Sequence, residues 1–85
     1  MSWYVYILRC RDDSYYTGIT TNLERRVRQH NTGTASKYTR SRLPVTLVHH
    51  TAVANRSVAS RMEAGIKKLS RSEKTWLIGV NNAHA

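Results

Sequence analysis

The stretch WYVYILRCRDDSYYTGITTNLERRVRQH, residues 3–30, decides the fold of this chain. Its first part, WYVYILR (3–9), alternates and is rich in aromatic and β-branched residues, which is typical of a β-strand. RDDS is a turn cluster, so YYTGI (15–19) predicts the returning strand of a hairpin. Thr21 followed three residues later by Glu24 matches a capping box, which predicts a helix over NLERRVRQHN (22–31).

The remainder of the chain predicts further elements in a simple order. They are a polar basic loop (32–44), a strand (45–53), a helix that opens at Asn55 (55–69), a helix that opens at a Ser70–Glu73 capping box (71–79), and a loose tail from about residue 80. The order β-β-α-β-α-α predicts one domain over residues 1–85. We expect an α+β fold, with a small three-stranded antiparallel sheet flanked by helices.

Charge is the strongest signal in the composition. Among 85 residues, Lys and Arg total 14 while Asp and Glu total 5, which gives a net charge of +9 with neutral histidines. Such a balance favours a polyanionic partner, and the predominance of arginine suits phosphate oxygens. No apolar run approaches the roughly 20 residues of a membrane span, so we expect no membrane partner. The single cysteine and an N-terminus unlike a signal peptide predict a cytoplasmic location.

The predicted helix over residues 22–31 carries charge on its inner face. Leu23, Arg26, Val27 and His30 follow the i, i+3, i+4, i+7 pattern and form one stripe that should pack against the sheet. An arginine there is costly unless it is paired or opens onto a cleft. A snorkelling Arg26 and a hydrogen-bonded packing His30 are the alternatives to a functional role.

The predicted helix over residues 55–69 has a similar anomaly. Glu63 borders its apolar face, three residues before Ile66. Such a carboxylate usually pairs with a base, and Lys67 is available at i+4. The functional alternative is an oxygen ligand for Mg²⁺, which typically takes one or two carboxylates.

Tyr4 and Tyr6 share one face of the first predicted strand. Tyrosine's ordinary pKa near 10 makes it a poor base unless a neighbouring cation lowers that pKa. Because Arg26 is predicted to face the sheet, we expect it to lower the pKa of such a tyrosine.

Together these motifs resemble the signature of the GIY-YIG nuclease family. YVY (4–6), YTG (16–18) and NLERRVRQH (22–30) match two tyrosine-bearing strand motifs followed by an Arg and then a His one turn on. Tyr6 and Tyr16 stand ten residues apart, and Glu63 matches the family's later helical glutamate, its metal ligand. The resemblance covers almost the whole chain and is closest to small stand-alone bacterial members.

The chain departs from the family pattern at several positions. Tyr4 replaces the first glycine of the family name, and Thr17 replaces the middle isoleucine of the second motif. Ile19 stands where many active members carry a basic or polar side chain. The family's later asparagine has no clear match, because Asn81 and Asn82 come too late.

The resemblance implies a nuclease that uses Mg²⁺ or Mn²⁺ to hydrolyse phosphodiester bonds of DNA, with RNA open as a further substrate. It implies that Tyr6 helps to deprotonate the attacking water and that Tyr16 hydrogen-bonds beside it. Arg26 would neutralise charge on the scissile phosphate, Glu63 would hold the metal, and His30 would orient or donate at the edge of the site. The candidates for backbone contacts lie on the long loop and are Lys37, Tyr38, Arg40 and Arg42.

Two alternatives from other classes remain open at the level of sequence. One is a non-catalytic nucleic-acid-binding module of a repair assembly, and the other is an adaptor whose basic face meets an acidic protein. A protein partner or a homodimer is compatible with each of these. The enzyme hypothesis requires that the catalytic candidates converge in one cleft, and these are Tyr6, Tyr16, Arg26, His30 and Glu63.

Overall fold

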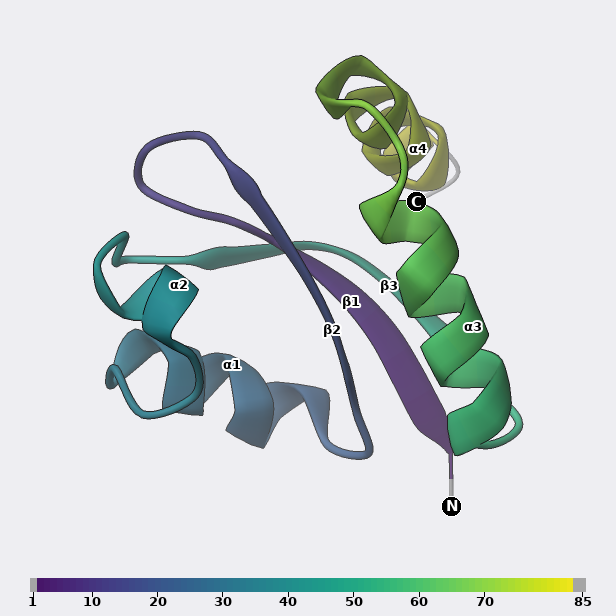
Figure 1. Ribbon diagram of the computed structural model, residues 1–85, viewed down its shortest axis with the longest axis horizontal. Helices are drawn as coiled ribbons and strands as arrows, with labels where there is room; N and C mark the ends of the chain where they lie inside the picture. The colour runs from purple at the N-terminus through teal and green to yellow at the C-terminus, as the bar shows by residue number, and fades with distance from the viewer. Residues whose placement is uncertain (1, 84–85) are drawn as a thin grey trace.

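The computed structural model describes residues 2–83, with side chains as far as residue 80. Three strands form one antiparallel sheet in the order β2-β1-β3 (Figure 1). They are β1 (Trp3–Arg9), β2 (Tyr15–Thr20) and β3 (Thr46–Val53). The α+β class, the hairpin and the antiparallel sheet predicted from the sequence are therefore confirmed.

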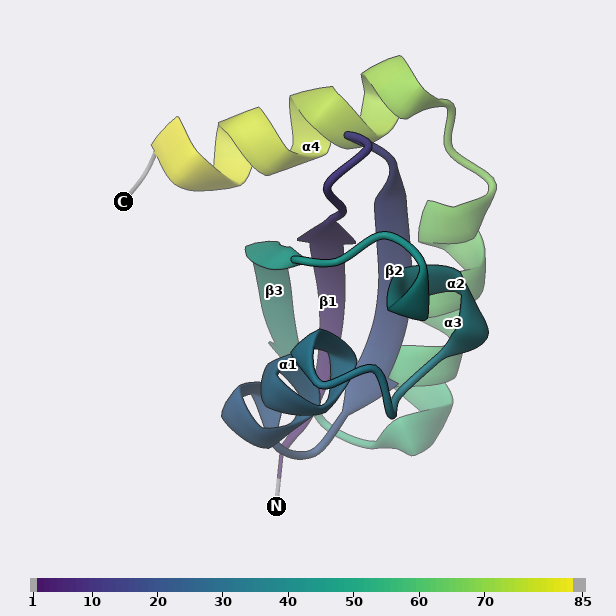
Figure 2. The ribbon, with the colours of Figure 1, turned by 90° about the vertical axis from the view of Figure 1, so that its left-hand side faces the viewer.

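The helices are α1 (Leu23–Asn31), the short α2 (Lys37–Arg40), α3 (Arg56–Lys67) and α4 (Arg71–Ala83). α1 and α2 lie on one face of the sheet and α3 lies on the other, while α4 follows the end of α3 and runs across one end of the sheet (Figures 1 and 2). Within residues 2–83, no helix is long and apolar enough to cross a membrane.

The alternation of side chains in β1 divides the core in two. Val5 and Ile7 point toward α3 and α4, where they pack with Ala59, Ile66 and Ile78. Tyr6 and Leu8, which alternate with them, point toward α1, where they form a second cluster with Cys10 and Val45. Because β1 is the central strand, this period of two gives each helical layer its own buried surface.

The caps show where local sequence determines the helix ends. The predicted capping box before α4 is confirmed, because Ser70 N donates to Glu73 Oε1 at 2.8 Å and Glu73 N donates to Ser70 Oγ at 3.2 Å. Asn55 caps α3 as predicted. The box predicted at Thr21 is wrong, since Asn22 Oδ1 caps α1 by accepting from Arg25 N at 3.0 Å.

Two segments are more ordered than the sequence indicates. The polar loop over residues 32–44 contains α2, and Asn31 ties it down by bonding both backbone groups of Val45. α4 continues to Ala83, past residue 80, where the sequence predicts the start of a loose tail. The rest of the predicted tail, residues 84–85, lies outside the described residues.

Candidate active site

Tyr6 lies directly against the glycine of the second tyrosine motif. The two residues are paired in the β1–β2 register. A Cβ atom at Gly18 would stand 2.5 Å from the Tyr6 hydroxyl and 2.6 Å from Cζ, closer than real contacts allow. The Tyr6 side chain therefore crosses β2 over Gly18, and only glycine leaves room for it there.

His30 is fully buried (0% exposed) and holds the Tyr6 hydroxyl from the α1 side. Its Nε2 is 2.9 Å from the Tyr6 hydroxyl, and its Nδ1 is 2.8 Å from Thr39 Oγ1. Burial, aided by the positive charge of Arg26, lowers the pKa of His30 to about 4. The imidazole is therefore neutral at pH 7, with one nitrogen donating and the other accepting.

The pKa of Tyr6 differs from the prediction. Burial raises it above its ordinary value, and the Arg26 guanidinium beside the hydroxyl lowers it by less than burial raises it. The nearby charges of Tyr16 and Glu63 raise the pKa further. The expectation that Arg26 leaves Tyr6 with a depressed pKa is wrong, because the sequence shows the cation but not the depth of burial.

Arg26 reaches this site from the middle of α1, on the inner face where the helical pattern places it. Its Nη1 donates to Gln29 Oε1 at 3.2 Å, whereas its buried Nε has no hydrogen-bond partner among the described residues. A buried guanidinium nitrogen without a partner is costly. It is therefore a donor available to an anionic ligand.

Tyr16 forms the other side of the imidazole environment. Its ring meets His30 edge-on at a centroid distance of 5.1 Å and stacks on Tyr38 at 6.0 Å. Arg42 lies over the Tyr38 ring at 3.9 Å and pairs with Asp12 at 3.0 Å.

The four loop candidates for backbone contacts therefore fall into two groups. Tyr38 and Arg42 already hold each other within the protein. Lys37 and Arg40 are exposed, and neither forms an ion pair within the described part of the chain.

Glu63 approaches from α3, which packs on the other face of the sheet. Its side chain is 24% exposed, and Oε2 lies 3.3 Å from Lys67 Nζ, as the i+4 spacing predicts. Its charge is near enough to raise the pKa of Tyr6. Arg26 and, to a smaller extent, Glu63 thus affect the pKa of the same hydroxyl, although their helices cover opposite faces.

The donors around Glu63 suit some metals and exclude others. No group of three or more His, Cys, Asp or Glu side chains suited to a metal occurs within the described residues, which argues against a structural zinc site. A single half-buried carboxylate suits Mg²⁺ or Mn²⁺, because such ions complete their shell with waters and substrate phosphates. Glu63 is therefore a fitting protein ligand for such an ion. When no metal is bound, the ammonium group of Lys67 partly neutralises the carboxylate.

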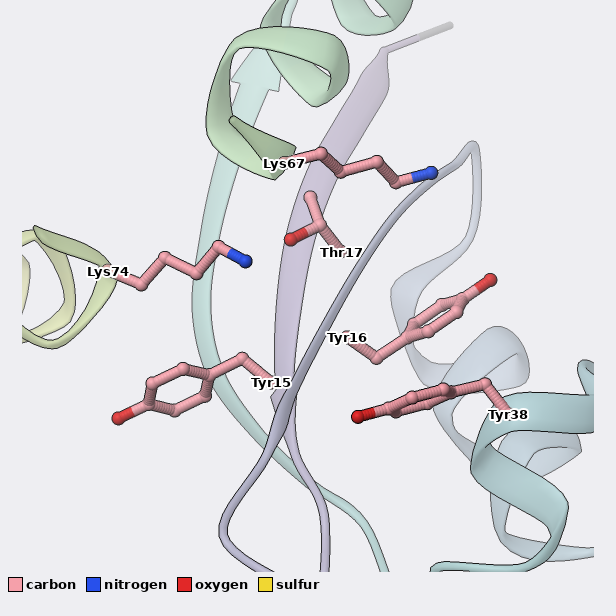
Figure 3. Close-up of a pocket in the computed structure, with 6 residues that line it drawn as sticks. All are labelled: Tyr15, Tyr16, Thr17, Tyr38, Lys67 and Lys74. Carbon is pink, nitrogen blue, oxygen red and sulfur yellow. The ribbon is translucent and has the colours of Figure 1, made fainter. Parts of the chain in front are cut away.

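An open groove of about 250 Å³ crosses the outer edge of β2 beside these residues (Figure 3). We call it the edge groove, and its lining residues are Tyr15, Tyr16, Thr17, Tyr38, Lys67 and Lys74. Of the five catalytic candidates only Tyr16 lines it, whereas Tyr6 (1% exposed) and His30 are buried. His30 is therefore an interior residue and does not lie at the edge of the site.

The sequence does not reveal the second partner of His30. Thr39 is fully buried on α2, and its Oγ1 also lies 2.9 Å from Ser36 Oγ. Ser36 is the N-cap of α2, so its hydroxyl also accepts from Thr39 N at 3.1 Å. The sequence signal that could have indicated this partner is the pair of hydroxyl residues, Ser36 and Thr39, in the long loop. The conformation of that loop, however, depends on tertiary contacts.

This fold and this arrangement of residues define a class. A three-stranded sheet that carries a tyrosine on each strand of its first hairpin, with an Arg–His helix following, is the arrangement of a GIY-YIG catalytic domain. Residues 2–76 match that family, described as the GIY-YIG catalytic domain. The chain belongs to the GIY-YIG family.

Within the family the chain is similar to proteins named UPF0213. It is 51% identical over 75 residues to the UPF0213 protein of Natronomonas pharaonis, and the match covers 88% of each chain. It is 52% identical over 75 residues to the UPF0213 protein of Clostridium perfringens, and that match covers 88% of this chain and 81% of the relative. A solution structure of a UPF0213 protein from Bacillus halodurans superposes with a TM-score of 0.61 at 45% identity, covering 94% of this chain and 85% of that one. The solution structure of a protein from E. faecalis superposes with a TM-score of 0.66 at 41% identity, covering 98% of this chain and 88% of that one.

Proposed function

We propose that the protein is a metal-dependent nuclease that hydrolyses phosphodiester bonds of DNA. One observation carries this proposal: the Arg26 guanidinium and, less strongly, the Glu63 carboxylate both affect the pKa of the Tyr6 hydroxyl, and the neighbouring Tyr16 lines the edge groove. Binding a phosphate requires the cation alone. A carboxylate beside it would repel the substrate, unless it serves to hold a divalent cation.

The hydroxyl of Tyr6 is the proposed base for the attacking water. Its raised pKa keeps it protonated at neutral pH, so it can accept a proton only while passing its own to a neighbour. Nε2 of His30 is that neighbour, at 2.9 Å; it is unprotonated at neutral pH and accepts the hydrogen bond of the hydroxyl, although burial makes it a weak base, so the proton shifts toward it only while the water is attacking. In this tautomer Nδ1–H donates to Thr39 Oγ1, which makes His30 and Thr39 positioning residues for Tyr6.

Arg26 and Glu63 are proposed to act on the phosphate. The buried, unpartnered Nε of Arg26 gives a donor for the charge that develops on the phosphate oxygens. A Mg²⁺ or Mn²⁺ ion held by Glu63 would supply Lewis-acid stabilisation of the same charge. Tyr16, on the groove side of His30, would hydrogen-bond beside the attacking water.

Nucleic acid is the proposed substrate because of the charge and its placement. The net charge of +9 attracts a polyanion from a distance. Lys37 and Arg40 on α2 present exposed cations close to the site, and these are the proposed backbone contacts. Affinity should therefore fall with salt, with a slope of about −0.9 per phosphate neutralised on duplex DNA.

The test compares DNA cleavage by two variants, in each of which one glutamate is replaced by glutamine. Glu63→Gln should abolish cleavage of plasmid and branched DNA in Mg²⁺ or Mn²⁺ while nucleic-acid binding persists. Glu24→Gln is the matched control, because Glu24 lies on the exposed side of α1 with a side chain 87% exposed. Cleavage by the unmutated protein must stop on addition of a chelator, and RNA is run in parallel. Normal cleavage by Glu63→Gln contradicts the assignment.

A second candidate function is a non-catalytic nucleic-acid-binding module of a repair assembly. It is favoured by Ile19, which is only partly buried on β2 where many active family members carry a basic or polar residue. This candidate replaces the first if the unmutated protein binds DNA but cuts no form of DNA or RNA in either metal.

A further inference from the structure

The edge groove contains groups for which the proposed reaction has no use. Lys74 in α4 extends toward Thr17, and the side chain of Lys67, at the end of α3, passes above Thr17 in the view of Figure 3. Lys74 is half-buried and forms no ion pair within the described residues, while Lys67 shares Glu63 at 3.3 Å. Two ammonium groups lining one small groove make it favourable for an anion.

Thr17 adds a second, independent observation. Its side chain is 3% exposed, and Oγ1 has no hydrogen-bond partner among the described residues. A buried hydroxyl without a partner is destabilising, and a valine of the same shape would remove that cost. The hydroxyl lies in the wall of the groove, between the two lysines, where a ligand oxygen would satisfy it.

We propose that Thr17, Lys67 and Lys74 form a phosphate subsite for a nucleic-acid strand, next to the phosphate that is cut. This inference rests on the proposed function. Three donors from two helices and a strand line the same groove, which suits the several oxygens of a phosphodiester. Thr17 Oγ1 is closed to water in this conformation, so binding requires the side chains around it to move.

The position of the subsite predicts the path of the strand. Neighbouring residues of β2 point to opposite faces, so Tyr16 belongs to the α1 side of the groove and Thr17 to the α3 side. A strand bound by Arg40 and Lys37 at one end and by Lys74 at the other would pass around the edge of β2. The proposed site of cutting lies between these ends.

Binding of a short fluorescent single-stranded oligonucleotide, measured by anisotropy in chelator at several salt concentrations, tests this proposal. Lys74→Met should weaken binding about tenfold and reduce the salt slope by about 0.7, the value for one phosphate of a single strand. Lys68→Met is the matched control. Lys68 is the exposed neighbour of Lys67 and does not line the groove, so binding should change less than twofold.

Thr17→Val separates binding from a purely structural role. The substitution should raise the thermal unfolding midpoint, because it removes the unpaired hydroxyl, and should nevertheless weaken oligonucleotide binding about threefold or more. If Thr17→Val and Lys74→Met both bind the oligonucleotide as tightly as the unmutated protein, the subsite is wrong. Cleavage by the unmutated protein in metal would leave the proposed function standing in that case.

A free phosphate or a mononucleotide offers the same chemistry as a strand. Titration with inorganic phosphate and with a mononucleotide, followed by ¹⁵N chemical shifts of residues 15–17 and 74, distinguishes these sources. We expect shifts at those residues only at concentrations at least a hundredfold above those needed with the oligonucleotide. Equal affinities overturn the assignment to a strand, and so does an unmutated protein that binds no oligonucleotide, which would also contradict the proposed function.

Discussion

The two faces of the sheet differ in what they bury, although they share the same strands. Toward α3 and α4 the buried hydrophobic cluster is aliphatic and consists of Val5, Ile7, Ala59, Ile66 and Ile78, and the polar Thr17 is buried on the same side. Toward α1 and α2 the buried set includes a hydrogen-bonded chain of Tyr6, His30 and Thr39. β1 contributes to both faces through alternate residues.

This difference separates stability from chemistry along a single strand. Aliphatic contacts are non-directional, so the α3 side depends on buried area and volume. The α1 side depends on particular partners, because an unpaired buried polar group costs free energy. Substitutions at neighbouring positions of β1 are therefore expected to affect different properties.

The largest expected loss of stability is at Ile7, which is fully buried among aliphatic side chains. Ile7→Ala should lower the free energy of unfolding by about 2–5 kcal/mol, through lost burial and the cavity that remains. Urea unfolding followed by circular dichroism measures this change. Molecules that remain folded should retain cleavage, because Tyr6 and His30 lie on the other face.

Tyr6→Phe is the matched substitution on the other side of the same strand. It keeps the ring against Gly18 but leaves His30 Nε2 without its partner. The free energy of unfolding should fall by about 1–3 kcal/mol, and cleavage should be lost. Full cleavage by Tyr6→Phe would show that the polar face does not supply the base.

Acid should weaken the α1 side through His30. Its pKa is about 4 in the folded protein against 6.5 ordinarily, so the unfolded chain binds the proton more readily between these values. Stability should therefore be constant above about pH 6.5 and fall toward pH 4, by an amount on the order of 3 kcal/mol at 1.36 kcal/mol per pKa unit. Urea midpoints measured across this range test the expected direction.

Two glutamine variants assign that pH dependence. His30→Gln should flatten the fall, whereas His50→Gln should change it only through His49, because His50 is exposed and its charge is the smaller cause that lowers the pKa of His49. His49, whose pKa is lowered by burial and by His50, contributes in the same direction in both variants. An equally steep fall in His30→Gln would exclude His30 as its source.

The sequence predicts the scaffold well because the signals that define it are local. The hairpin follows from the residue types of residues 3–19, and the inner position of Arg26 follows from helical periodicity. Two caps were also predicted from local patterns. The third is one residue off, since Asn22 and Thr21 are both good capping residues and only the path of the chain selects between them.

The details of the site depend on contacts that no local pattern encodes. Thr39 meets His30 across nine residues of loop, and Tyr6 meets His30 across twenty-four. The raised pKa of Tyr6 depends on how deeply these contacts bury the hydroxyl. The cation that was expected to lower this pKa is present, but desolvation exceeds its effect.

Gly18 of β2 is the residue against which the Tyr6 side chain lies, so a substitution there should affect both stability and the position of the Tyr6 hydroxyl. Gly18→Ala would place a Cβ atom within 2.6 Å of the Tyr6 hydroxyl and Cζ, so the ring or the strand must shift. Overpacking of this kind should cost about 1–3 kcal/mol, and cleavage should fall because the hydroxyl moves away from His30. Unchanged cleavage would mean that the contact with Gly18 does not position Tyr6.

The smallest expected effect is at Gly65. A change from glycine to alanine there adds the same methyl group as at Gly18, but without a close contact to Tyr6. Gly65 lies inside α3, and a Cβ atom there would meet no atom within 4 Å among the described residues. Gly65→Ala should raise the free energy of unfolding by about 0.5–1 kcal/mol, because glycine is a poor residue for a helix interior. Cleavage should be unaffected, since the new methyl group leaves Glu63 and Lys67 in place. If Gly65→Ala and Gly18→Ala lose stability and cleavage alike, the loss reflects any added methyl group and not the close approach of Tyr6 to β2.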